Sequence, residues 1–183
     1  SSPHTPNLLP DEDIGWFIGI YLSEGCRYRG SISIASHISE TSRVTRLQQI
    51  ATAFDGHCKV GNIKGNGMTI RIESPMLAAF IDTYVNGERA IGKHLNPRCW
   101  ARSNQFLKAV FLGFLEGDGS WDEKNQRWRL AITRNHALAR DFRTMAARLG
   151  WHLIFKQSYS TLKGKKFPTF RGEVRLSRNG HHN

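Results

Sequence analysis

A duplicated apolar segment places the strongest constraint on how this chain can fold. Residues 14–25 (IGWFIGIYLSEG) and residues 108–119 (KAVFLGFLEGDG) are both apolar runs that carry a glycine in the middle and end in a carboxylate followed by glycine. Corresponding positions of the two segments lie 94 residues apart. A single helix often ends in an acid and a glycine, but two such segments at one spacing indicate an internal repeat.

The composition of the two runs predicts a pair of buried helices. A helix that is apolar on nearly every side must be buried on more than one side, and the small residues Gly19 and Gly113 would allow two helix backbones to approach closely. Side-by-side packing would bring Glu24 and Asp118 together at one end of the pair, where both helix dipoles are negative. Because the two carboxylates would repel each other, we expect a divalent cation such as Mg²⁺ between them.

The segments 17–25 (FIGIYLSEG) and 111–119 (FLGFLEGDG) resemble the two motif helices of the LAGLIDADG homing endonucleases. The resemblance covers nearly the whole chain and implies a site-specific endonuclease that hydrolyses both strands of duplex DNA and acts as a monomer. It also implies that Glu24 and Asp118 are catalytic residues that bind the metal, although Glu24 stands where the family more often has Asp. Position 23, occupied by Ser23, is treated as equivalent to a glycine and is expected to supply no metal ligand. Mg²⁺ or Mn²⁺ would support cleavage, whereas Ca²⁺ would bind without supporting it.

Alternating helical and strand periodicity predicts an α+β fold, in which an αββαββ(α) unit occurs twice. We expect two antiparallel, saddle-shaped sheets related by a pseudo-twofold axis, with the motif helices at the interface. The expected divisions are a disordered leader over residues 1–10, a first repeat over 11–85, a linker over 86–103 and a second repeat over 104–183. The expected helices cover 12–24, 40–54, 75–85, 104–117 and 136–149, and the expected strands cover 26–29, 31–35, 57–64, 68–73, 119–123, 127–134, 152–159 and 168–177.

The charge balance favours a nucleic acid as the partner. The formal net charge is +11, from 26 basic and 15 acidic residues. A membrane is the weaker interpretation, because no apolar run approaches the roughly 20 residues that a span needs. The three cysteines, Cys26, Cys58 and Cys99, are widely spaced and show no zinc-binding pattern. We therefore expect an intracellular, reduced protein of a cytoplasm or an organelle, which is not secreted.

Strand alternation separates side chains that would face DNA from those that would face the core. Any one charged strand residue is more often simply solvated, but arginines repeated on several strands fit the major groove of a duplex. The residues expected to contact double-stranded DNA are Arg27, Arg29, Ser31, Ser33, Lys59, Lys64, Arg71, Arg127, Arg129, Thr133, Lys156, Gln157, Lys163, Arg171 and Arg175. The segment 163–166 is expected to form a loop that holds phosphates, and the unlike strands of the two repeats predict a long asymmetric target.

Lys93 is the third candidate catalytic residue, because a cation near the acids would stabilise the pentavalent phosphate. Its segment 92–97 (GKHLNP) resembles the lysine-containing segment that precedes the second motif in this family. The alternative is an ordinary solvated lysine in a linker. The histidines His37, His57 and His136 follow no spacing pattern and are expected to be structural or solvated, and the role of Glu116 is open.

Other functions on the same fold stay open. The main alternative is a nucleic-acid-binding protein that has lost cleavage, either a DNA-binding regulator or a maturase whose partner is intron RNA. A further alternative is the endonuclease part of an intein, suggested by the ending His182-Asn183, although the chain is too short to splice. An acid at the end of both motif segments favours the endonuclease.

Overall fold

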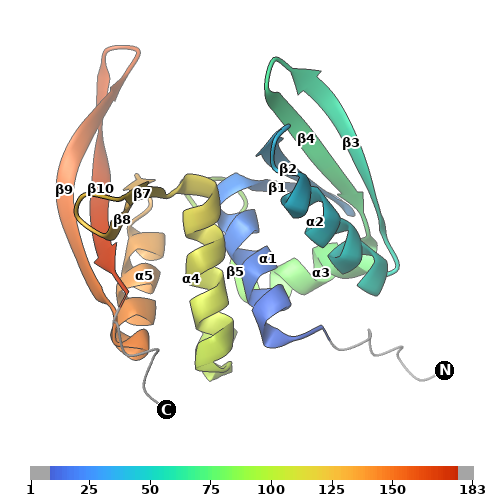
Figure 1. The fold of residues 1–183 in the computed structure, drawn as a ribbon, viewed down its shortest axis with the longest axis horizontal. Coiled ribbons are helices and arrows are strands. Elements are labelled where there is room, and N and C mark those ends of the chain that lie inside the picture. The colour runs from blue at the N-terminus through green and yellow to red at the C-terminus, as the bar shows by residue number, and fades with distance from the viewer. Residues whose placement is uncertain (1–8, 177–183) are drawn as a thin grey trace.

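The chain folds around a central pair of helices with one antiparallel sheet on each side (Figure 1). The computed structural model describes residues 9–176. The first half holds α1 (Asp11–Glu24), β1 (Gly25–Tyr28), β2 (Ser31–His37), α2 (Thr41–Ala53), β3 (His57–Lys64), β4 (Gly67–Glu73) and α3 (Pro75–Tyr84). The short elements β5 (Val85–Asn86), β6 (His94–Leu95) and the 3-10 helix η1 (Pro97–Ala101) follow. The second half holds α4 (Asn104–Asp118), β7 (Ser120–Asp122), β8 (Arg127–Thr133), α5 (His136–Leu149), β9 (His152–Leu162) and β10 (Lys165–Arg175).

The two motif helices, α1 and α4, pack backbone against backbone. A methyl group added at Gly19 would lie 2.2 Å from the carbonyl oxygen of Val110, and one added at Gly113 would lie 2.5 Å from that of Trp16. Neither position can therefore hold a side chain without moving the opposite helix. Every residue of α1 from 14 to 22 is buried, as expected for a helix enclosed on several sides. The predicted close approach of the two helices is confirmed.

The amino-terminal ends of the motif helices are also joined. Ser103 caps α4 by accepting a hydrogen bond from the backbone N–H of Phe106 at 3.1 Å. The Ser103 hydroxyl in turn donates to the carboxylate of Asp11, in the first turn of α1, at 2.6 Å. This hydrogen bond and the neighbouring Arg102 hold the pKa of Asp11 below its ordinary value, against the effect of burial. The helix pair is thus fixed at the end opposite the two motif acids.

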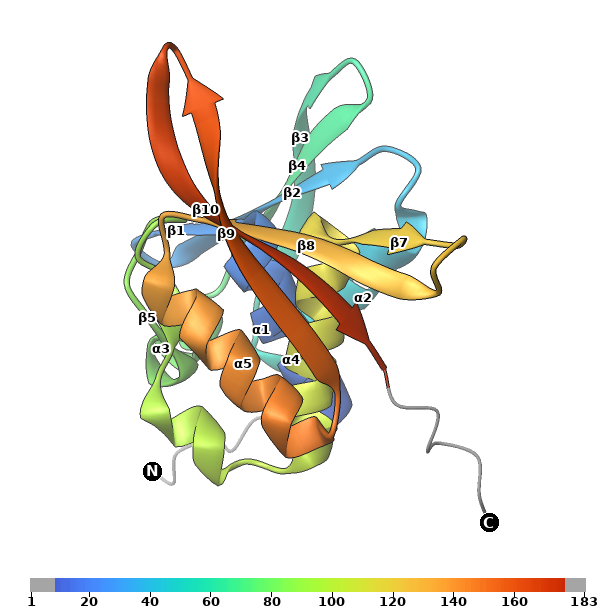
Figure 2. The ribbon, with the colours of Figure 1, turned by 90° about the vertical axis from the view of Figure 1, so that its left-hand side faces the viewer.

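The two sheets have the same strand order, which is β1-β2-β4-β3 in the first half and β7-β8-β10-β9 in the second. Figure 2 shows the β3–β4 and β9–β10 hairpins projecting beyond one end of the helices, while β9 and β10 also run down alongside α5. One face of each sheet packs on the helices, through side chains such as Ile32 and Ile70 in the first half and Leu130 and Val174 in the second. The predicted α+β fold with a duplicated unit is confirmed.

Two predictions about the second half and the linker need correction. We expected β9 and β10 to be separated by a loop, but both strands are 11 residues long and meet at a turn at Lys163 and Gly164, which both have positive φ. Lys165 and Lys166 consequently lie on β10 and not in a loop. The linker over 86–103 is not irregular, because it contains β6 and η1.

The ends of the chain bear on three further expectations. Most of the predicted leader, residues 1–8, lies outside the described residues, as does the His182-Asn183 ending. Leu9 packs against the core. Within residues 9–176 no helix follows β10, so this part of the chain holds no counterpart of α3. None of the helices in this part of the chain has the length and apolar character needed to cross a membrane.

Candidate functional site

The motif acids lie at the carboxyl-terminal ends of α1 and α4, and the first strand of each sheet, β1 or β7, follows directly (Figure 1). Glu24 is the last residue of α1 and is half-buried, whereas Asp118 is the last residue of α4 and is more exposed. The two helix ends are in contact, because a methyl group added at Gly117 would lie 3.0 Å from Cγ of Glu24. The fold therefore brings together two carboxylates that are 94 residues apart in the sequence.

Position 23 was treated as equivalent to a glycine, and this is wrong, because Ser23 has a side chain that the helix contact uses. Its repeat counterpart, 94 residues later, is Gly117. The Ser23 hydroxyl donates to the carbonyl oxygens of Ile20, at 3.1 Å, and Gly19, at 3.3 Å, both within α1. A methyl group added at Gly117 would collide with this hydroxyl. Ser23 therefore fills the space that the glycine of α4 leaves open, which packs the two acid-bearing ends together.

Each carboxylate sits in surroundings that disfavour its charge. Burial raises the pKa of Glu24, and the negative charge of Asp118 raises it further, while Arg43 and Lys93 act in the opposite direction. Burial also raises the pKa of Asp118, and the positive charge of Lys93 partly offsets this. Two partly desolvated carboxylates that repel each other gain from a shared positive charge.

The donor set fits a hard divalent cation. Carboxylate oxygens are preferred ligands of Mg²⁺ and Mn²⁺, which keep water or phosphate oxygens in their other positions. Within residues 9–176, no group of three or more His, Cys, Asp or Glu side chains is arranged around a metal-sized space. Glu24 and Asp118 could supply two carboxylate ligands, and the remaining positions would suit water and phosphate oxygens.

Lys93 is a buried residue that caps the end of α1. Its side chain is only 2% exposed. Its Nζ donates hydrogen bonds to the carbonyl oxygens of Tyr21, at 2.8 Å, and Gly25, at 2.6 Å, and lies 4.9 Å from the centre of the Tyr21 ring. Burial lowers the pKa of Lys93 to about 8, although Cys26, Asp118 and Glu24 favour its charged form. The alternative that Lys93 is a solvated linker lysine is wrong.

Two residues that hold this region together were missed in the sequence. Asn135 is buried and donates from Nδ2 to the carbonyl oxygen of Lys93 at 2.7 Å, so it fixes the backbone that presents the lysine. Arg43 on α2 is 3% exposed and contacts the last turn of α4 through Glu116. The only signal for this contact is Glu116 itself, because the corresponding position of the first motif is the apolar Leu22.

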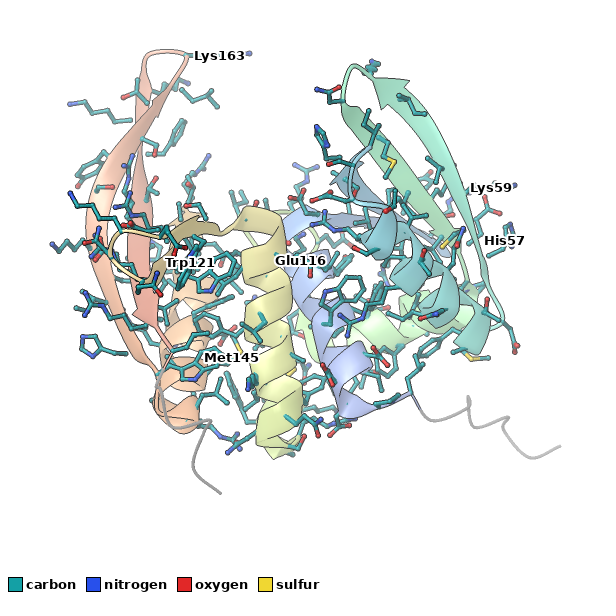
Figure 3. All side chains as sticks on the ribbon, viewed as in Figure 1. His57, Lys59, Glu116, Trp121, Met145 and Lys163 are labelled. Atoms are coloured by element: carbon teal, nitrogen blue, oxygen red, sulfur yellow. The ribbon has the colours of Figure 1, made fainter. Side chains whose placement is uncertain are left out.

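The outer face of the first sheet carries most of the polar residues predicted there. Register pairs Ser33 with Arg71, and Arg71 with Lys59, so these three side chains form one row on the face turned away from the helices. Ser31 lies in the next row and accepts a hydrogen bond from Nη2 of Arg71 at 3.2 Å. His57 and Lys59 lie on β3, the edge strand of this sheet (Figure 3).

Arg27 does not lie on that face, and its predicted placement is wrong. Register pairs Arg27 with Ile32, which belongs to the helix-facing row. Its guanidinium donates to the carbonyl oxygen of Ala78 at 3.2 Å and forms an ion pair with Asp82, and both partners lie on α3. The ion pair with Asp82 compensates the charge of Arg27 and so allows an arginine on the helix-facing side of the sheet. Arg29 lies in the β1–β2 turn with positive φ.

The outer face of the second sheet forms a concavity of about 710 Å³ that reaches Asp118. Lys156, Arg171, Thr133, Ser158 and Arg129 line it. A polar surface thus continues from one motif acid along the second sheet.

Other residues predicted on the second sheet lie elsewhere. Gln157 also lines the concavity. Its register partner is Phe170, which belongs to the helix-facing row, so Gln157 lies on the opposite face of the sheet from Lys156. Lys163 is at the tip of the β9–β10 hairpin (Figure 3), and Lys64 is at the corresponding end of β3. Arg175 lies at the far end of β10, opposite His152.

Two predicted DNA-binding arginines of the second sheet are ion-paired within the protein. Asp122 contacts both Arg127, whose Nε is 3.3 Å away, and Arg129. Arg127 also pairs with Glu173. Hydrogen bonds from Asn125 are the largest cause that lowers the pKa of Asp122, to about 2. The carboxylates partly cancel the positive charge at this edge of the sheet.

The three histidines considered in the sequence lie away from the acid pair. His37 Nδ1 lies 2.7 Å from the hydroxyl of Ser39, and His57 Nε2 lies 3.5 Å from the carboxylate of Glu73. The ring of His136 packs edge-on against Phe170.

Comparison with known proteins adds to this geometry. No family model matches the chain. The structure is similar to the crystal structure of I-DmoI in complex with DNA and Mn, with a TM-score of 0.64 and 14% identity, over 91% of this chain and 90% of that chain. I-DmoI is a homing endonuclease, and similar structures of it contain DNA with Mg or Ca. The N-terminal LAGLIDADG domain of DUF199/WhiA is similar with a TM-score of 0.56 and 14% identity, over 95% of this chain and 80% of that domain.

One curated protein is similar in sequence. It is the DNA-directed RNA polymerase subunit Rpo1C of Methanocaldococcus jannaschii, which is 28% identical over 117 residues. The match covers 62% of this chain and only 13% of the subunit. Most of that subunit therefore lies outside the similarity.

Proposed function

From the LAGLIDADG homing-endonuclease fold of this chain, we propose that it is a site-specific, metal-dependent endonuclease that cuts both strands of duplex DNA. The observation that carries the proposal is the contact between the two acid-bearing helix ends, Glu24 on α1 and Asp118 on α4. The similarity to I-DmoI in complex with DNA and Mn supports both the partner and the class of cofactor. The substrate is a phosphodiester bond in each strand.

Glu24 and Asp118 would hold the divalent cations, Mg²⁺ or Mn²⁺, through their carboxylate oxygens. A bound divalent cation lowers the pKa of a water ligand and neutralises the charge that develops on the leaving oxygen. The carboxylates would have to be ionised for this role, and each would serve the phosphate of one strand. The half-buried position of Glu24 would limit competing water and strengthen its interaction with the cation.

Lys93 supplies a fixed positive charge beside the acid pair. Its ammonium is held by the carbonyl oxygens of Tyr21 and Gly25, so it offsets the negative end of the α1 dipole next to Glu24. We assign it to the catalytic machinery through this electrostatic effect, because a cation near the reacting phosphate stabilises the additional negative charge of the transition state.

The outer faces of the two sheets bind the duplex on either side of the cleavage site. Ser31, Ser33, Lys59 and Arg71 face the duplex from the first sheet. Thr133, Lys156 and Arg171 do so from the second sheet. Basic side chains hold phosphates, and arginine and uncharged polar side chains also read base edges. Because one chain contains both halves and their faces differ, it acts as a monomer on a long asymmetric site.

Selection from a randomised duplex library tests the proposal. The wild-type protein with Mg²⁺ or Mn²⁺ should release ends cut in both strands at one sequence, and EDTA should prevent this. Glu24→Gln or Asp118→Asn should abolish cutting and leave DNA binding within about a few-fold, since neither acid holds the sheets on DNA. Glu12→Gln is the matched control, because Glu12 is an exposed carboxylate at the other end of α1. Cutting by Glu24→Gln or Asp118→Asn would contradict the assignment.

A DNA-binding protein without nuclease activity is the second candidate. It is favoured by the Lys93 ammonium, which is buried and directs two hydrogen bonds at carbonyl oxygens of the protein instead of at a substrate. The similarity to a LAGLIDADG domain of DUF199/WhiA is compatible with either function. Sequence-specific DNA binding with no cleavage in any divalent metal would support this candidate, and tighter binding to structured RNA than to DNA would support a maturase.

A further inference from the structure

Glu116 is held by side chains of the first half of the chain, although it lies on α4 in the second half. Trp16 Nε1, on α1, donates to Glu116 Oε2 at 2.7 Å. Arg43, on α2, approaches the other carboxylate oxygen with Nε at 3.4 Å and donates from Nη2 to the backbone carbonyl of Glu116 at 3.3 Å. Figure 3 shows Glu116 near the sheet end of α4. We infer that Arg43 is a positioning residue that fixes the Asp118 end of α4.

Arg43 is itself held rigidly at the junction of β2 and α2. Its Nη1 lies 2.9 Å from Glu40 Oε2 and donates to the hydroxyl of Ser36 at 3.4 Å. The same carboxylate oxygen of Glu40 accepts from the Ser36 hydroxyl at 2.6 Å and from the backbone N–H of His37 at 2.7 Å. A continuous set of polar contacts therefore runs from the end of β2, on the first sheet, to the last turn of α4.

The cluster is more than ordinary core packing would require. Burying a guanidinium costs free energy, and well-packed apolar residues of similar volume are often as stable. The repeat itself provides the apolar version, because Leu22 stands in the first motif where Glu116 stands in the second, and Val110 stands where Trp16 does. Within residues 9–176, Arg43 is the one buried arginine, and it lies next to the turn that ends in Asp118.

The two acid-bearing helix ends are thus held by different buried cations. Lys93 binds the carbonyl oxygens at the end of α1, which carries Glu24. Arg43 binds the carbonyl oxygen of Glu116, two residues before Asp118. Resting on the proposed function, this arrangement predicts that Arg43 governs the strand whose phosphate Asp118 serves, and that Lys93 governs the other strand.

Hydrogen exchange in the metal-free protein tests the positioning role without relying on activity. In Arg43→Met, the amides of residues 116–119 should exchange about tenfold faster, because the last turn of α4 loses its charged hydrogen-bond donor. Amide exchange at residues 22–26, the end of α1, should be unchanged in Arg43→Met. Lys93→Met should instead accelerate exchange at residues 22–26 and leave residues 116–119 unchanged. Arg148→Met is the control, since Arg148 also donates to a backbone carbonyl oxygen, that of Trp100 at 2.7 Å, but reaches α4 only at its opposite end, through Asn104. The inference would be overturned if Arg43→Met accelerated exchange equally at both helix ends, or changed it at neither.

Metal binding and cleavage supply the second readout. Arg43→Met should weaken Ca²⁺ binding, measured by calorimetry, by about 10- to 100-fold, as is typical when a group that orients a metal ligand is lost. On a supercoiled plasmid with the target site it should accumulate nicked circles with one strand preferentially cut. Equal slowing on both strands would count against the inference. A wild-type protein that cuts no DNA would refute the proposed function, while the exchange data would still decide the role of Arg43.

Two further variants guard against a loss of folding. Arg43→Lys keeps the charge but has one donor group in place of the planar fork, so it should restore part of the slow exchange. Glu116→Gln keeps the shape and an oxygen for Trp16, while it removes the ion pair with Arg43. If Arg43→Met does not fold, Glu116→Gln should still accelerate exchange at 116–119 selectively, and wild-type exchange in Glu116→Gln would overturn the inference.

Discussion

The two halves of the molecule share their backbone frame and differ in the side chains around it. Both sheets have the same strand order, and each motif helix has a glycine against the backbone of the other. Among residues 9–176, the first half has a third helix, α3, that the second half does not show, and the second half has the longer terminal hairpin, with strands of 11 residues. Lys93 holds the acid-bearing end of α1, in the first half, and Arg43 of α2 holds the acid-bearing end of α4, in the second half.

This difference teaches which features a duplication must keep. Backbone contacts leave no room for a side chain, so the glycines are constrained in both copies in the same way. A helix end needs a hydrogen-bond donor near its free carbonyl groups, but lysine or arginine from any nearby element can provide it. The common frame therefore stays symmetric, while the contacts made by long side chains diverge.

The largest expected effect tests the symmetric part of the comparison. Gly19→Leu and Gly113→Leu should both destabilise the fold strongly, because each side chain would be built into the backbone of the opposite helix. Overpacking a core typically costs about 1–3 kcal/mol, and contact with a rigid backbone places these variants at or above that range. Urea unfolding followed by circular dichroism measures the change. Gly61→Ala is the control, because nothing lies within 4 Å of an added methyl group there. A strong effect in only one motif helix would break the symmetry.

The symmetric frame is also what the sequence predicts best. The two motif segments predict the helix pair, because an apolar run with a central glycine and a terminal acid has one simple structural explanation. The hairpin of β3 and β4 follows from Gly65, Asn66 and Gly67, and the start of α3 follows from Ser74, which accepts a hydrogen bond from Leu77 N at 3.0 Å. These signals are local, so a single sequence contains them.

The contacts of long side chains could not be predicted in the same way. Arg27 alternates with Tyr28 as a surface residue would, and only the ion pair with Asp82 of α3 explains its position on the inner face. Lys93 and Arg43 are buried because distant carbonyl groups accept their hydrogen bonds. Tyr159 and Leu162 are exposed apolar residues, so the distal part of β9 lacks the buried face that periodicity detects. Each of these depends on partners that are far apart in the sequence.

The second prediction separates the two helix ends by pH. Burial places the pKa of Lys93 at about 8 in the folded protein, below the lysine value of 10.5. Below pH 8 the Lys93 side chain is protonated in both the folded and the unfolded protein. Between pH 8 and 10.5 it is protonated mainly in the unfolded protein. The wild-type free energy of unfolding, relative to Lys93→Met, should therefore rise with pH by at most about 3 kcal/mol between pH 8 and 10.5. The difference between wild type and Arg43→Met should stay flat, because an arginine side chain does not titrate there. Parallel curves for both pairs in urea titrations would contradict this.

The third prediction concerns the target. Arg71→Ala in the first sheet and Arg171→Ala in the second should each relax base preference on one side of the cleavage site, with a loss of about 1–3 kcal/mol if the arginine contacts a guanine. Binding to libraries with one randomised half-site measures this. If each variant changed preference on both sides, or if the protein preferred a palindrome and behaved as a dimer, the two halves would not read separate half-sites.

The smallest expected effect concerns the charge carried by the two outer faces. Asp122 pairs with Arg127 and Arg129, and its pKa of about 2 keeps it ionised under any ordinary binding conditions. In the first sheet Glu73 pairs with Arg71, whose Nε is 3.4 Å away.

Asp122→Asn should therefore free Arg129 and leave Arg127 with Glu173 as its only ion-pair partner among the described residues. Binding to non-specific duplex should strengthen by about two- to fivefold at 0.1 M salt, with a steeper salt dependence. Glu73→Gln should free one arginine and give a smaller gain. The opposite result would be informative, because a carboxylate on this face can also accept a hydrogen bond from the amino group of cytosine. Weaker binding by Asp122→Asn, confined to duplexes with cytosine at one position, would show that Asp122 reads a base and does not merely neutralise its neighbours.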